Sequence, residues 1–280
     1  MEGAVSSRAT SFYYSFLALP TEKRKAIIAV WDFCRAVDDE VDEPKARNEE
    51  ASGVPALARW REEVACLYEG REPATGQGRH LLPFIREFNL PRTAFEDLID
   101  GVAMDLDQRR YDTFEALRQY CLRVASAVGL ICVEIFGYRD VQSRDYAVNL
   151  GIALQLTNIV RDVGADLQRG RLYIPLEDLR RFGCTEEDLR IGIVTENVRH
   201  LLAFECERAR QYYRKAAQAL PPRDARGLIA ARMMAAIYGE LLRAIERSNY
   251  DVFQRRIRVG RPRQAMIAAL TWLKIPFALK

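Results

Sequence analysis

Paired acidic residues at helical spacing are the first feature of the sequence that could do chemistry. In a helix over residues 21–43, the segment DDEVDE places Asp38 and Asp42 on one otherwise apolar face, four residues apart. Two like charges at this spacing destabilise a helix, and burying them costs more, so a positive charge must lie close to them. Arg35 is one candidate, and magnesium is a stronger one because it prefers hard oxygen ligands. The alternative is a solvated acidic face with Asp38 at its edge.

A second polar ribbon runs along a helix, predicted over residues 144–166, that is apolar nearly all round and therefore buried. Amides and carboxylates persist there only when they are paired or bound to a metal. A polar network to other helices is the alternative, but two such helices in one chain favour two acidic ribbons facing each other across a cavity in a bundle. The ribbon consists of Gln155, Asn158, Asp162 and Asp166, with Arg161 to one side.

These two ribbons predict diphosphate chemistry. Carboxylates bridged by magnesium bind diphosphates because the ion pairs with phosphate oxygens, and the metal neutralises a departing diphosphate. Apolar helix faces below the metal suit a hydrophobic tail, so the arrangement predicts ionisation of an allylic diphosphate. The two histidines, His80 and His200, are far apart in the sequence. This argues against a ferritin-like di-iron site, a zinc site and a Ser–His or Cys–His triad.

The elements that must position these residues are almost all helices. Long segments with helical periodicity alternate with breaks at Gly and Pro, and β-branched alternation is scarce. No break is long or polar enough to be a domain linker. The sequence therefore predicts an all-α fold, a single-domain helical bundle over residues 1–280 with a central active-site cavity. The predicted helices cover residues 21–43, 55–69, 80–88, 92–107, 113–136, 144–166, 176–182, 185–191, 196–219, 225–247 and 263–274.

Composition excludes several classes of protein. The chain has 280 residues, 49% of them hydrophobic and 29% charged, which is typical of a globular protein. Its 42 basic and 39 acidic residues are too balanced for a dedicated nucleic-acid binder. Six cysteines without a CxxC spacing indicate reduced core residues. No signal peptide is visible, and no uncharged apolar stretch reaches the ~18 residues of a membrane span. We expect a cytoplasmic protein that at most lies on the inner face of a membrane.

Three further segments have two interpretations each. Residues 255–263 hold five arginines, interpreted as a solvated basic loop, with anionic lipid or diphosphate as the alternative partner. The apolar stretch 265–279 is predicted to be a terminal core helix first and a membrane-surface contact second. The loop 168–175 is either a plain surface turn or a mobile cover over the metals that offers Arg169, Arg171 and Tyr173.

Four segments carry a resemblance to a known family. They are SFYYSF at residues 11–16, FCRAVDDEVDE at 33–43, RYDTFEALRQYCLRVASAVGL at 110–130 and LGIALQLTNIVRDVGADLQRGRLYIP at 150–175. Together they resemble the squalene/phytoene synthase family over almost the whole chain. The resemblance implies an isoprenoid-synthase fold, Mg²⁺ with Mn²⁺ as a second option, and head-to-head (1′-1) joining of two prenyl diphosphates through a cyclopropyl intermediate.

The resemblance also implies roles for individual residues. Asp38 and Asp42 match the first aspartate motif, and the second metal-binding set is Asn158, Asp162 and Asp166. The implied catalytic residues are Asp38, Asp162 and Tyr120, the last near the reacting carbons. The implied substrate contacts are Ser11, Trp31, Arg35, Gln155, Arg161 and Tyr238. Arg8 matches a basic position loosely, and Met104 with Asp105 resembles another family patch.

The small residues that follow Tyr120 have two interpretations as well. They remove side-chain bulk from the middle of a helix, which lets either a chain-like ligand or a neighbouring helix approach closely. The residues are Ala125, Ser126, Ala127 and Gly129.

Within the family, the motifs look most like presqualene diphosphate synthases of bacterial hopanoid pathways, which act on farnesyl diphosphate. Formation of squalene would need NADPH. The sequence has no GxGxxG motif to support NADPH binding, so the use of NADPH stays open. The alternative is a phytoene synthase acting on two geranylgeranyl diphosphates. The alternative from another class is a non-catalytic helical subunit. The expected partners are prenyl diphosphates and, peripherally, a membrane, but no nucleic acid; the sequence leaves the oligomeric state open.

Overall fold

Side-chain caps define where several helices begin. The computed structural model describes residues 10–42 and 54–274. Thr75, Thr113, Thr185 and Thr195 each accept a hydrogen bond from a backbone N–H in the first turn of the helix that follows. Gly192 ends a helix at φ 73°, a left-handed conformation that favours glycine. Local sequence therefore fixes many of the helix ends.

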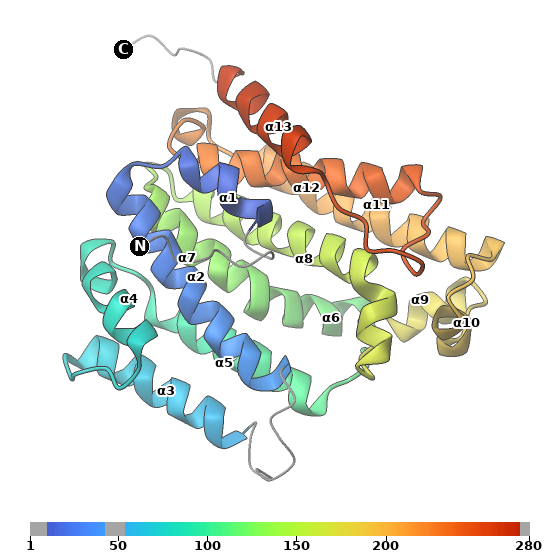
Figure 1. The fold of residues 1–280 in the computed structure, drawn as a ribbon, viewed down its shortest axis with the longest axis horizontal. Coiled ribbons are helices and arrows are strands. Elements are labelled where there is room, and N and C mark those ends of the chain that lie inside the picture. The colour runs from blue at the N-terminus through green and yellow to red at the C-terminus, as the bar shows by residue number, and fades with distance from the viewer. Residues whose placement is uncertain (1–9, 43–53, 275–280) are drawn as a thin grey trace.

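Nearly all of the described secondary structure is helical, and the all-α prediction is confirmed (Figure 1). The strand-like pairing within the described part of the chain is an isolated parallel bridge between Arg110 and Leu172. The elements are α1 Thr10–Leu17, α2 Thr21–Asp42, α3 Val54–Glu69, α4 Gly76–Glu87, α5 Arg92–Asp107, α6 Phe114–Cys121, the π-helical turn η1 Leu122–Ser126, α7 Ala127–Phe136, α8 Gln142–Gln168, α9 Leu176–Arg181, α10 Glu186–Ile191, α11 Glu196–Ala219, the 3₁₀ turn η2 Pro222–Asp224, α12 Ile229–Arg247 and α13 Arg261–Leu273.

Helix α8 is the central element of the bundle. It packs against α6, η1, α7, α10, α11 and α12, and Figure 1 shows it running through the middle of the molecule. Its buried residues point in most directions, from Tyr146 near its start to Leu167 near its end. This confirms the prediction of a helix that is apolar nearly all round. The apolar core forms two large clusters, one among α2–α5 and α7 and one among α6, α8, α11 and α12.

Glycines let the central helices approach closely. A Cβ atom on Gly151 of α8 would lie 2.7 Å from the Cα of Ser126, and one on Gly129 of α7 would lie 2.8 Å from the carbonyl oxygen of Ala147. Neither contact is sterically tolerable. Ser126 and Gly129 therefore serve close packing of η1 and α7 on α8, and Ala125 and Gly129 also line the large cavity of the bundle.

The structure differs from the predicted elements in four main places, one of which is α4, which begins at Gly76 rather than at residue 80. Helix α1 was not predicted because its apolar run is short and ends near Pro20. The helix predicted over 113–136 contains a π-helical turn, which apolar periodicity does not reveal. The helix predicted to begin at residue 225 begins at Ile229, after a 3₁₀ turn.

One helical stretch among the described residues, Phe114–Phe136, is long and apolar enough to cross a membrane. It comprises α6, η1 and α7, which pack against α5 and α8 inside the bundle. A core helix meets the same criteria of length and composition, so this stretch is weak evidence for a membrane span.

Candidate active site

A cavity of about 950 Å³ lies among α2, α5, η1, α7, α8 and α12, and the segment 252–261 completes its wall. One part is apolar, lined by residues such as Phe16, Ile27, Leu150 and Met234. The other part is strongly charged. Eight arginines and four aspartates of the described residues line the cavity: Arg35, Arg161, Arg169, Arg171, Arg255, Arg256, Arg258, Arg261, Asp38, Asp105, Asp162 and Asp166.

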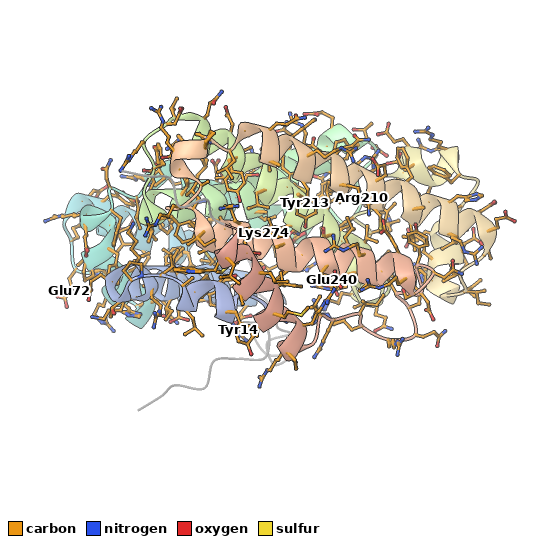
Figure 2. The ribbon with its side chains drawn as sticks, turned by 90° about the horizontal axis from the view of Figure 1, so that it is seen from above. Tyr14, Glu72, Arg210, Tyr213, Glu240 and Lys274 are labelled. Carbon is orange, nitrogen blue, oxygen red and sulfur yellow. The ribbon has the colours of Figure 1, made fainter. Side chains whose placement is uncertain are left out.

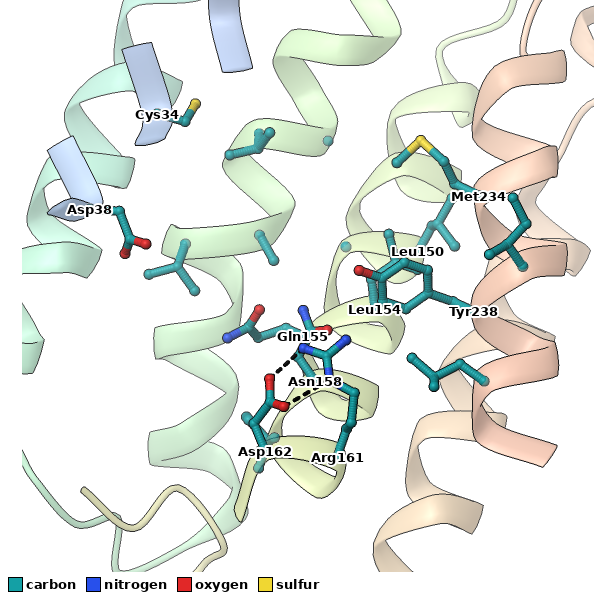
Figure 3. A pocket seen from close by; sticks show the side chains of 18 of the residues that line it. Cys34, Asp38, Leu150, Leu154, Gln155, Asn158, Arg161, Asp162, Met234 and Tyr238 are labelled. Atoms are coloured by element: carbon teal, nitrogen blue, oxygen red, sulfur yellow. Dashed lines mark hydrogen bonds and ion pairs between the residues drawn. The ribbon is translucent and has the colours of Figure 1, made fainter. Parts of the chain in front are cut away.

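Helices α2 and α8 contribute the polar side chains that the sequence analysis singled out. Asp38 of α2 and Asp162 of α8 lie on different walls of the same cavity, with Gln155 and Asn158 beside Asp162 (Figure 3). Asp38 is exposed, so this part of the cavity is open to solvent. Asp38 and the predicted ribbon of α8 do face one cavity.

The apolar face of α2 that carries Asp38 is the cavity wall and not the core face of the helix. Trp31, Cys34 and Asp38 line the cavity, whereas the fully buried core face of the helix carries Phe33 and Val37. A core face and the wall of an apolar cavity have the same composition, so periodicity alone could not separate them.

Asp162 is held by two arginines. Arg161 donates from Nε to Asp162 Oδ1 at 2.8 Å and from Nη2 to Oδ2, and Arg256 donates from Nε to Oδ1 at 3.0 Å and from Nη2 to Oδ2 at 2.9 Å. Burial opposes ionisation of Asp162, but these two guanidinium groups outweigh it and hold its pKa below the usual value. Two cations on one carboxylate leave excess positive charge where an anion could bind.

Two other polar residues complete this region. Asn158 Oδ1 is buried and has no hydrogen-bond partner among the described residues, so it is available to a ligand. Arg35 donates to Asp39 at 3.3 Å and lines the cavity. Within the described part of the chain, no three His, Cys, Asp or Glu side chains converge to form a metal site by themselves. Magnesium needs fewer, because it is typically bound by one or two carboxylates together with substrate phosphates.

A pair of tyrosines lies on the α5 side of the cavity. Tyr120 of α6 and Tyr173 both donate to Asp105, at 2.9 Å to Oδ2 and 2.7 Å to Oδ1. Their rings stack with centroids 5.1 Å apart, and Tyr111 stacks on Tyr173 at 5.9 Å. Burial and the nearby Asp105 carboxylate raise the pKa of Tyr120 well above its usual value, so it stays protonated.

The arginine segment is the solvated loop that we expected, with Arg255, Arg256 and Arg258 exposed, but it also forms part of the cavity wall. Residues 252–261 line the cavity, with Val252 and Ile257 buried. Phe253 lies against Gly164 and Gly192, where added Cβ atoms would approach it to 3.2 and 3.3 Å. The ion pair between Arg256 and Asp162 joins residues 94 positions apart, so only the run of arginines without an acidic residue could have signalled this role.

The loop 168–175, interpreted as either a plain surface turn or a mobile cover, is fixed at both ends. Leu172 N donates to Arg109 O at 2.9 Å, and Leu176 N donates to Tyr111 O at 2.8 Å. Arg169, Arg171 and Tyr173 line the cavity as expected, but from a segment held by backbone hydrogen bonds.

Most of the residues proposed from sequence line this one cavity. They are Trp31, Arg35, Asp38, Tyr120, Gln155, Asn158, Arg161, Asp162, Asp166 and Tyr238. The side chains of Ser11 and Asp42, and all of Arg8, lie outside the described residues. From sequence, Arg256 was identified only as one of the five arginines in residues 255–263, and Asp105 only by its resemblance to a family patch.

The comparison with family models decides the classification. Residues 5–263 match the model of the squalene/phytoene synthase family. The chain belongs to this family. The resemblance stated from the sequence is thereby confirmed, and membership in the squalene/phytoene synthase family assigns the chain to the head-to-head prenyltransferases, which act on prenyl diphosphates.

Curated relatives within the squalene/phytoene synthase family include several phytoene synthases. The 15-cis-phytoene synthase of Synechocystis sp. is 37% identical over 95% of this chain and 81% of its own. That of Synechococcus elongatus is 38% identical over 90% of this chain and 84% of its own.

Solved structures show the same fold. A dehydrosqualene synthase superimposes with a TM-score of 0.85 at 29% identity, covering 95% of this chain and 91% of its own. A squalene synthase, HpnC from Alicyclobacillus acidocaldarius, gives 0.76 at 33% identity, covering 85% and 89%. The predicted isoprenoid-synthase fold is confirmed.

Proposed function

We propose that this chain joins two geranylgeranyl diphosphates head to head, as a phytoene synthase does. The observation that supports this most is the 37–38% identity to curated 15-cis-phytoene synthases over nine-tenths or more of the chain. The alternative function, synthesis of presqualene diphosphate, was favoured by the sequence motifs but has less support. It remains the second candidate because the 33% identical structural relative is a squalene synthase.

The division of the cavity supports two prenyl diphosphates as substrates. The arginines that line its charged part would bind diphosphate by charge-assisted hydrogen bonds. The apolar part, which includes Leu154 and Met234 (Figure 3), would bury the prenyl chains. One cavity that combines both environments fits an amphiphilic substrate.

Magnesium fits the donor set at the charged part. Asp38, Asn158, Asp162 and Asp166 would hold it, because they offer hard oxygen atoms and the buried Asn158 Oδ1 has no hydrogen-bond partner within residues 10–42 and 54–274. Bound there, magnesium supplies charge neutralisation of the departing diphosphate. Asp42 is added to these magnesium ligands only because it matches the first aspartate motif.

The residues of the chain itself have three tasks in this reaction. Arg161 and Arg256 hold diphosphate oxygen atoms at the charged part. The rings of Tyr120, Tyr173 and Trp31 face the cavity and stabilise an allylic cation by about 1 kcal/mol each. The apolar wall excludes water, which would otherwise capture the cation as an alcohol.

The decisive experiment supplies purified protein and Mg²⁺ with farnesyl or geranylgeranyl diphosphate, with and without NADPH, and identifies products by mass. We expect a C40 hydrocarbon from geranylgeranyl diphosphate without NADPH. Efficient C30 product from farnesyl diphosphate alone would favour the second candidate. No coupled product from either substrate would leave only a non-catalytic role.

We also propose that helix α13 contacts a membrane surface, from the cytoplasmic side. Its exposed apolar side chains include Trp272 at 51% and Leu273 at 75% exposure. No acidic residue occurs between residues 252 and 274, whereas six arginines and lysines do. Figure 2 shows Lys274 at the end of this helix and Tyr14 of α1, which packs beside it. An apolar face flanked by basic residues is typical of an interfacial helix.

Vesicle binding tests this contact. Trp272 fluorescence should shift to shorter wavelength with phosphatidylglycerol vesicles and less with phosphatidylcholine vesicles, because anionic headgroups attract the basic residues. Leu273→Ser should weaken sedimentation with the anionic vesicles. Ile193→Ser, at a 61% exposed apolar residue after α10, is the matched control and should not. Equal binding of the two variants would refute the assignment to α13.

A further inference from the structure

Asp105 occupies a place where a carboxylate is electrostatically unfavourable. It lies in the last turn of α5, which has no basic residue, and it is 7% exposed. The C-terminal end of a helix repels negative charge, and burial adds to the cost. A buried acid at such a position needs hydrogen-bond donors, and the structure supplies two phenols.

Both phenols donate their hydroxyl hydrogen bonds to this carboxylate. Tyr173 donates to Asp105 Oδ1 at 2.7 Å and Tyr120 donates to Oδ2 at 2.9 Å. A phenol has only one O–H to donate. The contact between the two hydroxyl oxygens is 3.4 Å, too long to compete with these bonds.

This hydrogen bonding determines what the tyrosines can offer to a substrate. Asp105, Tyr120 and Tyr173 all line the cavity. With both protons directed to Asp105, the phenolic oxygens can act there only as acceptors, next to the π-faces of two stacked rings. Acceptor oxygens and ring faces stabilise positive charge, whereas an O–H directed into the cavity would destabilise it.

We infer that Asp105 is a positioning residue that orients Tyr120 and Tyr173 so that their phenolic oxygen lone pairs and ring faces are directed toward the prenyl cation. The inference rests on the proposed function, because the cation arises from a prenyl diphosphate. It joins three elements distant in sequence: Asp105 in α5, Tyr120 in α6 and Tyr173 after α8.

The test replaces the carboxylate by a group of the same size. The side-chain amide of Asp105→Asn can accept from one phenol but donates to the other, which must then turn its proton elsewhere. We expect kcat for diphosphate release to fall by about 10- to 100-fold, with KM changed less than about 3-fold. A larger share of prenyl alcohol should appear, because a poorly stabilised cation is captured by water.

Tyr173→Phe keeps the carboxylate and removes one of its donors. It should show the same product change more weakly, and its effect should be less than additive with Asp105→Asn because both remove one interaction. This variant keeps the inference testable even if Asp105→Asn folds poorly.

Asp224→Asn is the matched control. Asp224 is 3% exposed and accepts from Arg139 N, Asp140 N and Ser143 Oγ at 2.8–2.9 Å, away from the cavity. The Asp224→Asn variant should have a lower melting temperature than the wild type but the same ratio of coupled product to prenyl alcohol. Near-ultraviolet circular dichroism, which reports the stacked tyrosines, should change for Asp105→Asn and not for Asp224→Asn.

The possible outcomes distinguish a failure of the proposed function from a failure of the role inferred for Asp105. A wild-type protein that couples neither prenyl diphosphate overturns the proposed function. An active wild type whose Asp105→Asn variant keeps kcat, product ratio and near-ultraviolet spectrum overturns the role of Asp105 alone. Equal changes in Asp105→Asn and Asp224→Asn overturn it too, because they would show a purely structural effect.

Discussion

Asp162 is the residue on which the charged part of the cavity depends. It separates two guanidinium groups that would otherwise repel each other, and it presents oxygen atoms to the cavity. Asp162→Asn should lower the diphosphate-release rate by at least about 100-fold, because the amide neither balances the arginines nor provides an anionic ligand.

The measurement is steady-state diphosphate release with Mg²⁺, alongside circular dichroism to show that the helices persist. Asp140→Asn is a suitable control, because Asp140 pairs with Arg223 at 2.6 Å outside the cavity. Activity of the Asp162 variant close to that of the control would exclude Asp162 from the diphosphate site.

A buried ionic cluster joins helices α9 and α11. Arg208 donates to Asp178 at 2.7 Å and to Glu205 at 2.8 Å, and its guanidinium lies 4.2 Å from the centre of the Phe114 ring. Burial raises the pKa of Glu205 to about 8, although Arg208 opposes the shift. Glu205 is therefore protonated in the folded chain at neutral pH.

This raised pKa predicts a pH dependence of stability. Between an unfolded pKa of about 4.3 and the folded value, the folded state binds one proton more, so stability falls as pH rises through this range, by at most about 1.4 kcal/mol per pH unit. Glu205→Gln, which stays neutral, should flatten melting temperature against pH between 6 and 8. Glu246→Gln on the half-buried Arg210 pair should leave the wild-type slope, and an unchanged slope in both variants would contradict the buried titration.

Glu240 of α12 anchors the segment that carries the cavity arginines. It is 4% exposed and pairs with Arg243 at 2.9 Å, Arg247 at 3.0 Å and Arg263 at 3.2 Å. Arg263 lies in the first turn of α13, two residues after the segment 252–261 ends. Arginines from both sides hold the pKa of Glu240 at about 2 despite its burial.

Glu240→Gln should therefore loosen this segment. We expect KM for the prenyl diphosphate to rise about 5-fold, equivalent to the loss of about 1 kcal/mol, with a smaller change in kcat. Glu207→Gln, which breaks exposed pairs with Arg210 and Arg214 on α11, should leave KM unchanged. If both variants behave alike, the anchor does not act through the cavity.

The sequence alone was sufficient to predict structural features that depend on a single helix. Helix α8 is long and regular, so helical periodicity predicted that Gln155, Asn158 and Asp162 lie along one side of it. All three line the cavity. Features that depend on distant contacts could not be predicted. The bonds from Tyr173 to Asp105 and from Arg256 to Asp162 span 68 and 94 residues, and no local periodicity encodes such pairings.

The packing of the whole bundle sets the length of the cavity and so the substrate it can hold. Helices α2, α7, α8 and α12 enclose the apolar part, into which Met234 of α12 projects (Figure 3). Met234→Trp adds volume there, so it should lower kcat/KM for geranylgeranyl diphosphate more than for farnesyl diphosphate, by about 10-fold in the ratio. Met234→Leu conserves volume and should leave this ratio near the wild-type value. Competition between the two substrates, with products identified by mass, measures the ratio directly. A ratio that does not move in the tryptophan variant would mean that the prenyl chains do not reach Met234.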